Sequence, residues 1–310
     1  MDAAIKHHQK GACLTKPSST EPALQAHSLS QLLAGGIKAA DAEAAIFRDL
    51  EAQSFVILRA DALSLRALQQ AETLLVDGFF KALADETKIK HQGKRMQLVS
   101  CGYSRGPQRE QWHMACGAED RHAQPWPSEQ VEAAMLDTHL LFRRIAIRCL
   151  EALLPPLAAR SASSLGQLHA ACTAGASNPS DPSVLDCFLY GATAVEEKLG
   201  VHTDPGIFTV KRVSEVPGVF IRCHDGSWLD VESSASPCDL VVWAADQLAT
   251  AAKSDGSSIR AVEHCVRTPT GRERSSFVYE LRAPESLLCR SCRHGMPVSS
   301  CSVCRHYPVG

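Results

Sequence analysis

The feature that most constrains the fold is a series of short apolar runs in the last third of the chain. Seven such runs alternate with turns between residues 184 and 283. Two connections carry hairpin signals, the Asp-Gly pair in HDGS (224–227) and the PTGRE turn (269–273). Short strands that follow one another without helices between them are typical of a sandwich or barrel, so we predict a core of the jelly-roll type. The runs are VLDCFLY, IFTVKRV, GVFIRCH, SWLDVE, DLVVWAA, IRAVEHCVR and SSFVYELRA.

The region before these runs has mostly helical periodicity, from about residue 29 to residue 165. Residues 61–92 form a long amphipathic stretch with Asp61 as its expected N-cap, and residues 127–156 form a second one that ends at a double proline. SFVILRA (54–60) is expected to be a short strand. Helices followed by strands predict an α+β fold.

These changes in pattern divide the chain into four segments. Residues 1–28 are polar and contain KPSSTEP, which is typical of a flexible tail. Residues 29–183 are mainly helical, and their last part (161–183) is rich in Ser, Ala, Gly and Pro, which indicates a loop or boundary. Residues 184–285 form the predicted β core, and residues 286–310 form a cysteine-rich appendage.

The composition limits the partners that the chain can have. The net charge is -2 and the pI is near 6.7, with no basic stripe, which argues against nucleic acid and an anionic membrane surface. No apolar run reaches the length of a membrane span, and the N-terminus lacks the apolar core of a signal peptide. We therefore expect a cytoplasmic protein. In that reducing compartment, the nine scattered cysteines from Cys13 to Cys265 are expected to be small buried apolar residues.

The stretch HTDPG (202–206) offers two side chains that can bind a metal. On a strand, His202 and Asp204 point to the same side because side chains alternate with period two. His264, in AVEHCVR on another expected strand, offers a third ligand. Two histidines and one carboxylate on one face of a metal leave the opposite positions open, as in non-haem Fe(II) oxygenases. The alternative is a chance match, because the chain has 13 histidines and a reversed Asp-x-His pattern that ends at His139.

Arg274 and Ser276 form a second constellation beyond the PTGRE turn. They share one face of their strand, which the turn would place beside the strand of His264. An arginine inside a barrel needs an anion, because an unpaired buried charge is costly, and its guanidinium fits a carboxylate with two hydrogen bonds. A small dicarboxylate with the shape of 2-oxoglutarate would chelate the metal at one end and bind Arg274 at the other. The alternative is an exposed arginine and serine after a turn.

Six motifs follow one another in the order FLYG, KLGVHTDPGIFTV, GVFIRCHDGSWLDV, DLVVWAADQLATAA, SIRAVEHCVR and GRERSSFVYELRAP. This ordered set resembles the 2-oxoglutarate and Fe(II)-dependent dioxygenases of the isopenicillin N synthase-like type. Weaker similarity upstream, in LEAQSFVILRADAL and LLVDGFFKALADETKIKH, extends the resemblance over most of residues 29–285.

The resemblance implies a double-stranded β-helix, a cupin-like form of the jelly roll. It also implies that a small organic substrate and O2 react with 2-oxoglutarate at Fe(II), with release of succinate and CO2. Hydroxylation of the substrate is the expected outcome, with desaturation or ring closure as alternatives. The implied residues are His202, Asp204 and His264 for Fe(II), and Arg274, Ser276 and Tyr190 for 2-oxoglutarate.

Several residues near the implied pocket depart from the family pattern. Gly191 follows Tyr190 where the family often has proline, and Cys265 stands where arginine is common. Trp243 and Ala245 replace the usual Asn and Gly. These departures leave open a catalytically degenerate member that binds a metabolite or partner. A cupin-like isomerase or hydrolase is a further alternative, but it gives no reason for Arg274 and Ser276.

Two other segments carry predictions. The loop SRGPQREQWHM (104–114) lies where relatives place part of the substrate entrance, so Arg109, Gln111 and His113 either contact a polar substrate or belong to a solvated loop. The C-terminal cysteines form two Cys-x2-Cys pairs that could supply four thiolates to a structural zinc, or remain free thiols. These cysteines are Cys289, Cys292, Cys301 and Cys304.

Overall fold

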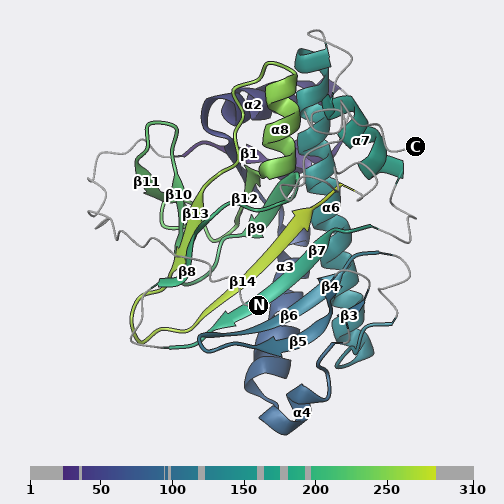
Figure 1. Ribbon diagram of the computed structural model, residues 1–310, viewed down its shortest axis with the longest axis vertical. Helices are drawn as coiled ribbons and strands as arrows, with labels where there is room; N and C mark the ends of the chain where they lie inside the picture. The colour runs from purple at the N-terminus through teal and green to yellow at the C-terminus, as the bar shows by residue number, and fades with distance from the viewer. Residues whose placement is uncertain are drawn as a thin grey trace, which may run out of the picture.

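The computed structural model describes residues 24–34, 37–93, 95–96, 99–117, 123–158, 164–174, 181–192 and 197–283. Within these ranges, two sheets make up the β core (Figure 1). The larger sheet has eight strands in the order β1-β2-β12-β9-β14-β7-β6-β5. Its strands are β1 (Ala26–Ser28), β2 (Phe55–Arg59), β5 (Gly102–Arg105), β6 (Arg109–Ala115), β7 (Val184–Tyr190), β9 (Phe208–Arg212), β12 (Asp239–Ala244) and β14 (Arg274–Leu281).

The smaller sheet has four strands in the order β11-β10-β13-β8. Its inner residues, such as Ile221 and Val266, form one apolar cluster with Ile57 and Val241 of the larger sheet. The two sheets therefore face each other, and the predicted jelly roll of the double-stranded β-helix type is confirmed. The strands are β8 (Glu197–His202), β10 (Val219–Arg222), β11 (Trp228–Asp230) and β13 (His264–Arg267), and a separate two-stranded sheet pairs β3 (Arg95–Met96) with β4 (Val99–Ser100).

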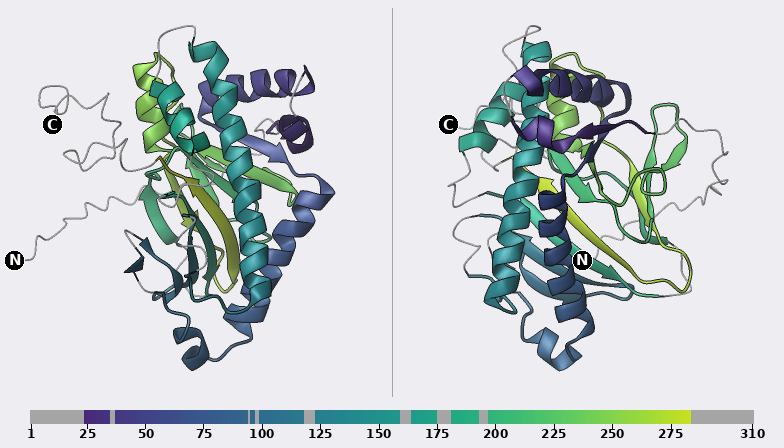
Figure 2. Two further views of the ribbon diagram at one scale, coloured as in Figure 1. Left: turned by 90° about the vertical axis from the view of Figure 1, so that its right-hand side faces the viewer. Right: turned by 180° about the vertical axis from the view of Figure 1, so that it is seen from behind.

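Helices cover the outer face of the larger sheet, so the fold is α+β as predicted (Figure 2). Asp61 caps α3 as expected, because its carboxylate accepts hydrogen bonds from the backbone N–H groups of Leu63 and Ser64. The helices are α1 (Leu29–Ala34), α2 (Ile37–Gln53), α3 (Ala62–Leu75), the π-helical η1 (Val76–Lys81), α4 (Asp85–Ile89), α6 (Glu129–Ala158), α7 (Ser164–Ala174) and α8 (Asp246–Ser254).

The two faces of β14 show how the sequence separates the core from the site. Phe277, Tyr279 and Leu281 point outward into the apolar cluster under the helices. Arg274 and Ser276 alternate with them and point inward, toward the smaller sheet, yet both are buried. A buried polar face on a central strand needs internal partners or a ligand.

Four expectations about where helices, strands and the tail begin or end were wrong. Helix α6 continues through Pro155 and Pro156 to Ala158, although proline inside a helix removes a backbone hydrogen bond, so the double proline does not mark the end of this helix. Residues 164–174 form a helix rather than a loop, and α8 interrupts the run of strands. Residues 26–28 pair with β2 instead of belonging to a flexible tail.

The PTGRE segment does not form a hairpin. Strand β13 pairs with β10 and β8, whereas β14 pairs with β7 and β9. The segment therefore crosses from one sheet to the other, and Arg274 does not lie beside the strand of His264. Gly271, with a φ of 75°, supplies the left-handed conformation that this turn needs.

None of the eight cysteines within the described ranges forms a disulfide, and six of them are buried. They behave as the small apolar residues that we expected. None of the helices in these ranges is long and apolar enough to cross a membrane. The four C-terminal cysteines lie outside the described residues, and their zinc site stays a prediction.

Candidate metal and cosubstrate site

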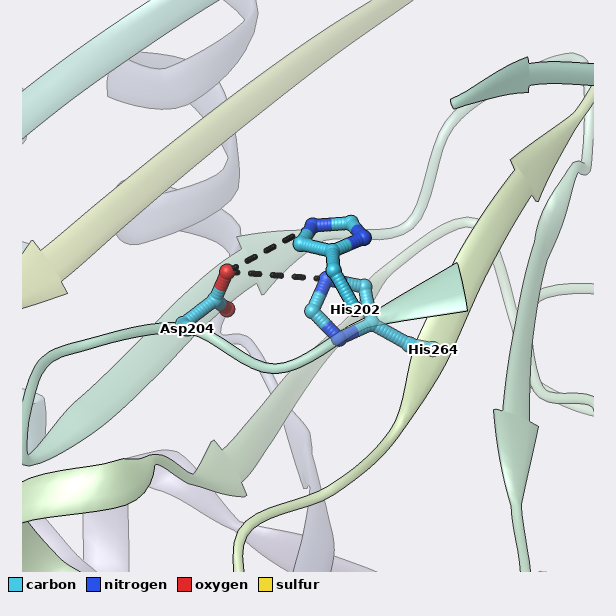
Figure 3. Close-up of side chains that lie close together, drawn as sticks. All are labelled: His202, Asp204 and His264. Carbon is cyan, nitrogen blue, oxygen red and sulfur yellow. Dashed lines mark ion pairs between the residues drawn. The ribbon is translucent and has the colours of Figure 1, made fainter. Parts of the chain in front are cut away.

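Three potential metal ligands meet where the smaller sheet approaches the larger one (Figure 3). His202 ends β8 and His264 begins β13, and the two residues are direct partners in the ladder. Asp204 lies two residues beyond β8, in the turn that leads to β9. Its Oδ1 is 3.7 Å from Nε2 of His202 and 3.6 Å from Nε2 of His264. The structure thus gathers the three side chains that the sequence singled out, with their ligand atoms within 4.8 Å of one another.

Backbone carbonyls set the tautomers of both histidines. Nδ1 of His202 lies 2.8 Å from the carbonyl oxygen of Gly200, and Nδ1 of His264 lies 3.2 Å from that of Val262. A carbonyl oxygen only accepts, so each Nδ1 carries the proton and donates it. The lone pair of each imidazole is then on Nε2, which faces Asp204 and is free to bind a metal.

The carboxylate of Asp204 is held through its other oxygen. Oδ2 accepts hydrogen bonds from Thr209 Oγ1 at 2.5 Å and from the indole Nε1 of Trp243 at 2.9 Å. These two donors leave Oδ1 turned toward the histidines. The sequence showed Trp243 only as a departure from the family pattern, but its indole orients the ligand, as outer-shell partners of metal ligands do.

Burial keeps His264 in the neutral form that a metal requires. Burial is the largest effect, and the nearby His202 acts in the same direction, so together they lower the pKa of His264 although Asp204 opposes them. Two neutral imidazoles and one carboxylate are the donor set typical of non-haem Fe(II), and three ligands on one side leave further coordination positions. The residues present therefore fit Fe(II).

The other residues implied for 2-oxoglutarate lie on the inner face of the larger sheet. Arg274 of β14 is the direct ladder partner of Tyr190 of β7, and Arg109 of β6 lies on the other side of Tyr190. The guanidinium carbon of Arg274 is 5.5 Å from the centre of the Tyr190 ring. Ser276 follows on the same face, opposite Phe188, and is buried.

Arg274 has an internal anion that the sequence analysis missed. Its Nη2 donates a hydrogen bond to Oε2 of Glu232 at 2.9 Å, and Glu232 also forms an ion pair with Lys211. We refer to Lys211, Glu232 and Arg274 as the anchor cluster. A lysine inside the apolar run IFTVKRV was the signal in the sequence, because a charged side chain pointing into a barrel needs a partner.

The Nε and Nη1 atoms of Arg274 are buried and have no hydrogen-bond partner. Unpaired buried donors of this kind are uncommon in proteins and indicate a place where a ligand acceptor fits. The anchor cluster therefore still fits a carboxylate, even though Glu232 uses one nitrogen of the guanidinium.

The predicted entrance segment forms the hairpin β5–β6 rather than an open loop. His113 Nδ1 lies 2.5 Å from Oδ1 of Asp186, and Gln111 Nε2 donates to the same oxygen at 2.7 Å. The guanidinium of Arg109 lies over the Phe188 ring, 5.0 Å from its centre. All three side chains thus reach the inner face of the larger sheet, and none belongs to a solvated loop.

Comparisons with known proteins agree with this architecture. The family model of the 2OG-Fe(II) oxygenase superfamily matches residues 180–283, which contain the three candidate ligands and Arg274. Gibberellin 2-beta-dioxygenase 3 of Arabidopsis thaliana is 32% identical over 96 residues. These residues are 30% of this chain, and they span only 27% of the length of that curated relative.

Solved structures share the fold over most of its length. Neurospora crassa T7H, in complex with alpha-KG and 5-formyluracil, has a TM-score of 0.68 at 19% identity, over 87% of this chain and 88% of that chain. The dioxygenase for auxin oxidation of rice has a TM-score of 0.65 at 18% identity, over 85% of this chain and 84% of that one. Fold and donor set together define a double-stranded β-helix protein with two histidines and a carboxylate gathered at one point. The β core, residues 180–283, matches the model of the 2OG-Fe(II) oxygenase superfamily.

Proposed function

We propose that the chain is a 2-oxoglutarate-dependent Fe(II) dioxygenase that oxidises a small organic substrate. The observation that carries this proposal is the pairing of two complementary ends on one barrel interior. His202, Asp204 and His264 turn free lone pairs toward one another at one end. At the other end, Arg274 keeps buried N–H donors without a partner.

The three ligands would hold Fe(II), and Arg274, Ser276 and Tyr190 would bind the distal carboxylate of 2-oxoglutarate. When bound, the iron and 2-oxoglutarate supply oxidative chemistry that consumes O2 and releases succinate, CO2 and the oxidised substrate. The protein contributes orientation. Trp243 and Thr209 fix the Asp204 carboxylate, and the two carbonyl-bound imidazoles keep their tautomers.

A group of polar side chains on the inner face of the larger sheet supports a polar substrate. His113, Asp186 and Glu280 lie on the inner face of the larger sheet, and Glu280 is the ladder partner of Thr209, which binds Asp204. Arg282 pairs with Glu280. These side chains favour a small substrate with hydrogen-bonding groups over a plain hydrocarbon. The relatives named above act on or bind small organic molecules, which supports the same class.

The direct test is turnover of 2-oxoglutarate by the purified protein with Fe(II) and O2, scored as succinate release across a panel of small polar substrates. Stimulation of succinate release by a substrate supports the proposal. His202→Ala should reduce that stimulated release to background, because it removes a ligand. Equal succinate release by His202→Ala would contradict the assignment.

A second candidate is a family member without activity that binds a metabolite or partner. The contact between Glu232 and Arg274 favours it, because a protein carboxylate already occupies part of the anchor. Binding of 2-oxoglutarate without succinate release, whatever the substrate, would support this candidate. We also propose a cytoplasmic location, which is supported by the reduced state of the cysteines within the described ranges.

A further inference from the structure

The anchor cluster is a closed unit of three charged side chains. The Lys211 and Glu232 side chains are 2% and 0% exposed, and that of Arg274 is 0% exposed. Glu232 Oε1 accepts from Lys211 Nζ and from the backbone N–H of Ser214. Its Oε2 accepts from Gly218 N at 2.8 Å, and also from Val219 N and Arg274 Nη2. Five donors thus fix this one carboxylate inside the barrel.

All three side chains carry their charges at neutral pH. Burial favours the neutral acid, but the adjacent charges of Lys211 and Arg274 outweigh it and hold the pKa of Glu232 far below its ordinary value. Burial lowers the pKa of Lys211 to about 8, with Arg274 adding to the effect and Glu232 opposing it. Lys211 therefore remains a cation at pH 7.

The charges of the anchor cluster do not cancel. Two cations and one anion leave a net charge of +1, whereas a pair of Arg274 and Glu232 alone would be neutral. The surplus matches one carboxylate, and the buried Nε and Nη1 of Arg274 are the donors that such a carboxylate would meet. In a site screened from water, a surplus charge of this kind strongly affects the affinity for an anion.

We infer that Lys211 supplies the positive charge with which this protein binds the distal carboxylate of its cosubstrate, and that Glu232 positions Arg274 rather than blocking it. This inference rests on the proposed function. Lys211 and Glu232 are then positioning residues. The affinity for 2-oxoglutarate is expected to rise with the net positive charge of the anchor cluster.

Four proteins with different net charges test this inference. The wild type has a net charge of +1, Lys211→Met of 0, Glu232→Gln of +2, and the double variant Lys211→Met/Glu232→Gln of +1 again. Affinity is measured by calorimetric titration of 2-oxoglutarate into the Mn(II)-loaded proteins, so the readout does not depend on activity. 2-Oxopentanoate, which has a methyl group in place of the distal carboxylate, is titrated in parallel.

We expect Lys211→Met to weaken 2-oxoglutarate binding by at least about tenfold, because the carboxylate then enters a neutral cluster. The double variant should bind more tightly than Lys211→Met, because its net charge is restored to +1, and less tightly than Glu232→Gln, whose net charge is +2. Binding of 2-oxopentanoate should stay the same in every variant. If Glu232 instead competes with the ligand, the double variant will bind as tightly as Glu232→Gln, and that result would overturn the inference.

Lys88→Met is the matched control. Lys88 is also a buried lysine in an ion pair, 2.7 Å from Glu110, but it lies outside the barrel interior. Its replacement should leave 2-oxoglutarate affinity unchanged. Lys211→Met alone decides the question if the Glu232 variants do not fold, because it keeps Glu232 and four of its five donors.

The two proposals fail differently. A wild-type protein that binds Mn(II) but no 2-oxoglutarate would refute the cosubstrate of the proposed function and this inference with it. A wild type that binds 2-oxoglutarate, together with a Lys211→Met variant of equal affinity, would refute the inference alone.

Discussion

The two ends of the barrel interior carry net charges of opposite sign. At the metal end, formed by His202, Asp204 and His264, one carboxylate faces the Nε2 atoms of two imidazoles, and no lysine or arginine is paired with that carboxylate among the described residues. At the anchor cluster, two cations surround one carboxylate. The first end therefore has a surplus negative charge and the second a surplus positive charge. From this difference we infer that each end binds a ligand of opposite charge. The metal end binds a metal cation, and the anchor cluster binds a carboxylate.

The largest effect is expected from removal of the negative charge at the metal end. Asp204→Ala should reduce Mn(II) affinity by more than about 100-fold, because the variant loses both a ligand and the negative charge that faces the histidines. Calorimetric titration with Mn(II) measures this change, and circular dichroism checks the fold. One equivalent of tightly bound Mn(II) in a folded Asp204→Ala protein would show that the metal end does not bind metal in this way.

A smaller effect is expected from the residue that orients Asp204. Trp243→Phe removes the indole N–H that binds Oδ2 and should weaken Mn(II) binding by about tenfold. Trp112→Phe is the control, because the Nε1 of Trp112 is buried without a hydrogen-bond partner and its loss breaks no such bond. Equal Mn(II) affinities for the two variants would mean that the indole of Trp243 only fills space.

The anchor cluster should make the free energy of unfolding depend on pH in the acid range. The pKa of Glu232 is lowered from its ordinary value of 4.5, so its stabilising contribution is present above pH 4.5 and is lost as the pH falls toward the folded-state pKa. The difference in unfolding free energy between wild type and Glu232→Gln should therefore shrink below pH 4.5, by up to about 1.4 kcal/mol per pH unit. Urea unfolding at several pH values measures it. A difference that stays constant down to pH 3 would argue against an ionised Glu232.

The sequence predicted the metal end better than the anchor cluster, for a physical reason. His202 and Asp204 are neighbours in the chain, and His264 belongs to a recognisable motif, so local spacing carried most of the information. Glu232 reaches Arg274 only because the two sheets close over each other. No local pattern specifies that approach.

The same limit explains the errors in the fold. The turn at Gly271 was interpreted as a hairpin because its residues indicate that the chain changes direction. Turn residues do not indicate which strands pair on either side of the turn. Residues 164–174 looked like a loop because their small side chains gave a weak pattern, yet Leu165 and Leu168 are buried in the outer core. The inner and outer faces of β14 were predictable, because they depend on alternation within one strand.

The most direct test of the account is an anaerobic titration of the Fe(II)-loaded protein with 2-oxoglutarate, followed by the visible metal-to-ligand absorption band. The band requires a 2-oxo acid that chelates the iron, and its concentration dependence in Lys211→Met reports what the anchor cluster contributes. We expect the band to saturate at one equivalent in the wild type, to be absent in Asp204→Ala, and to need a higher 2-oxoglutarate concentration in Lys211→Met. A wild-type protein that binds both Fe(II) and 2-oxoglutarate without developing the band would contradict the claim that the two ends serve one ligand.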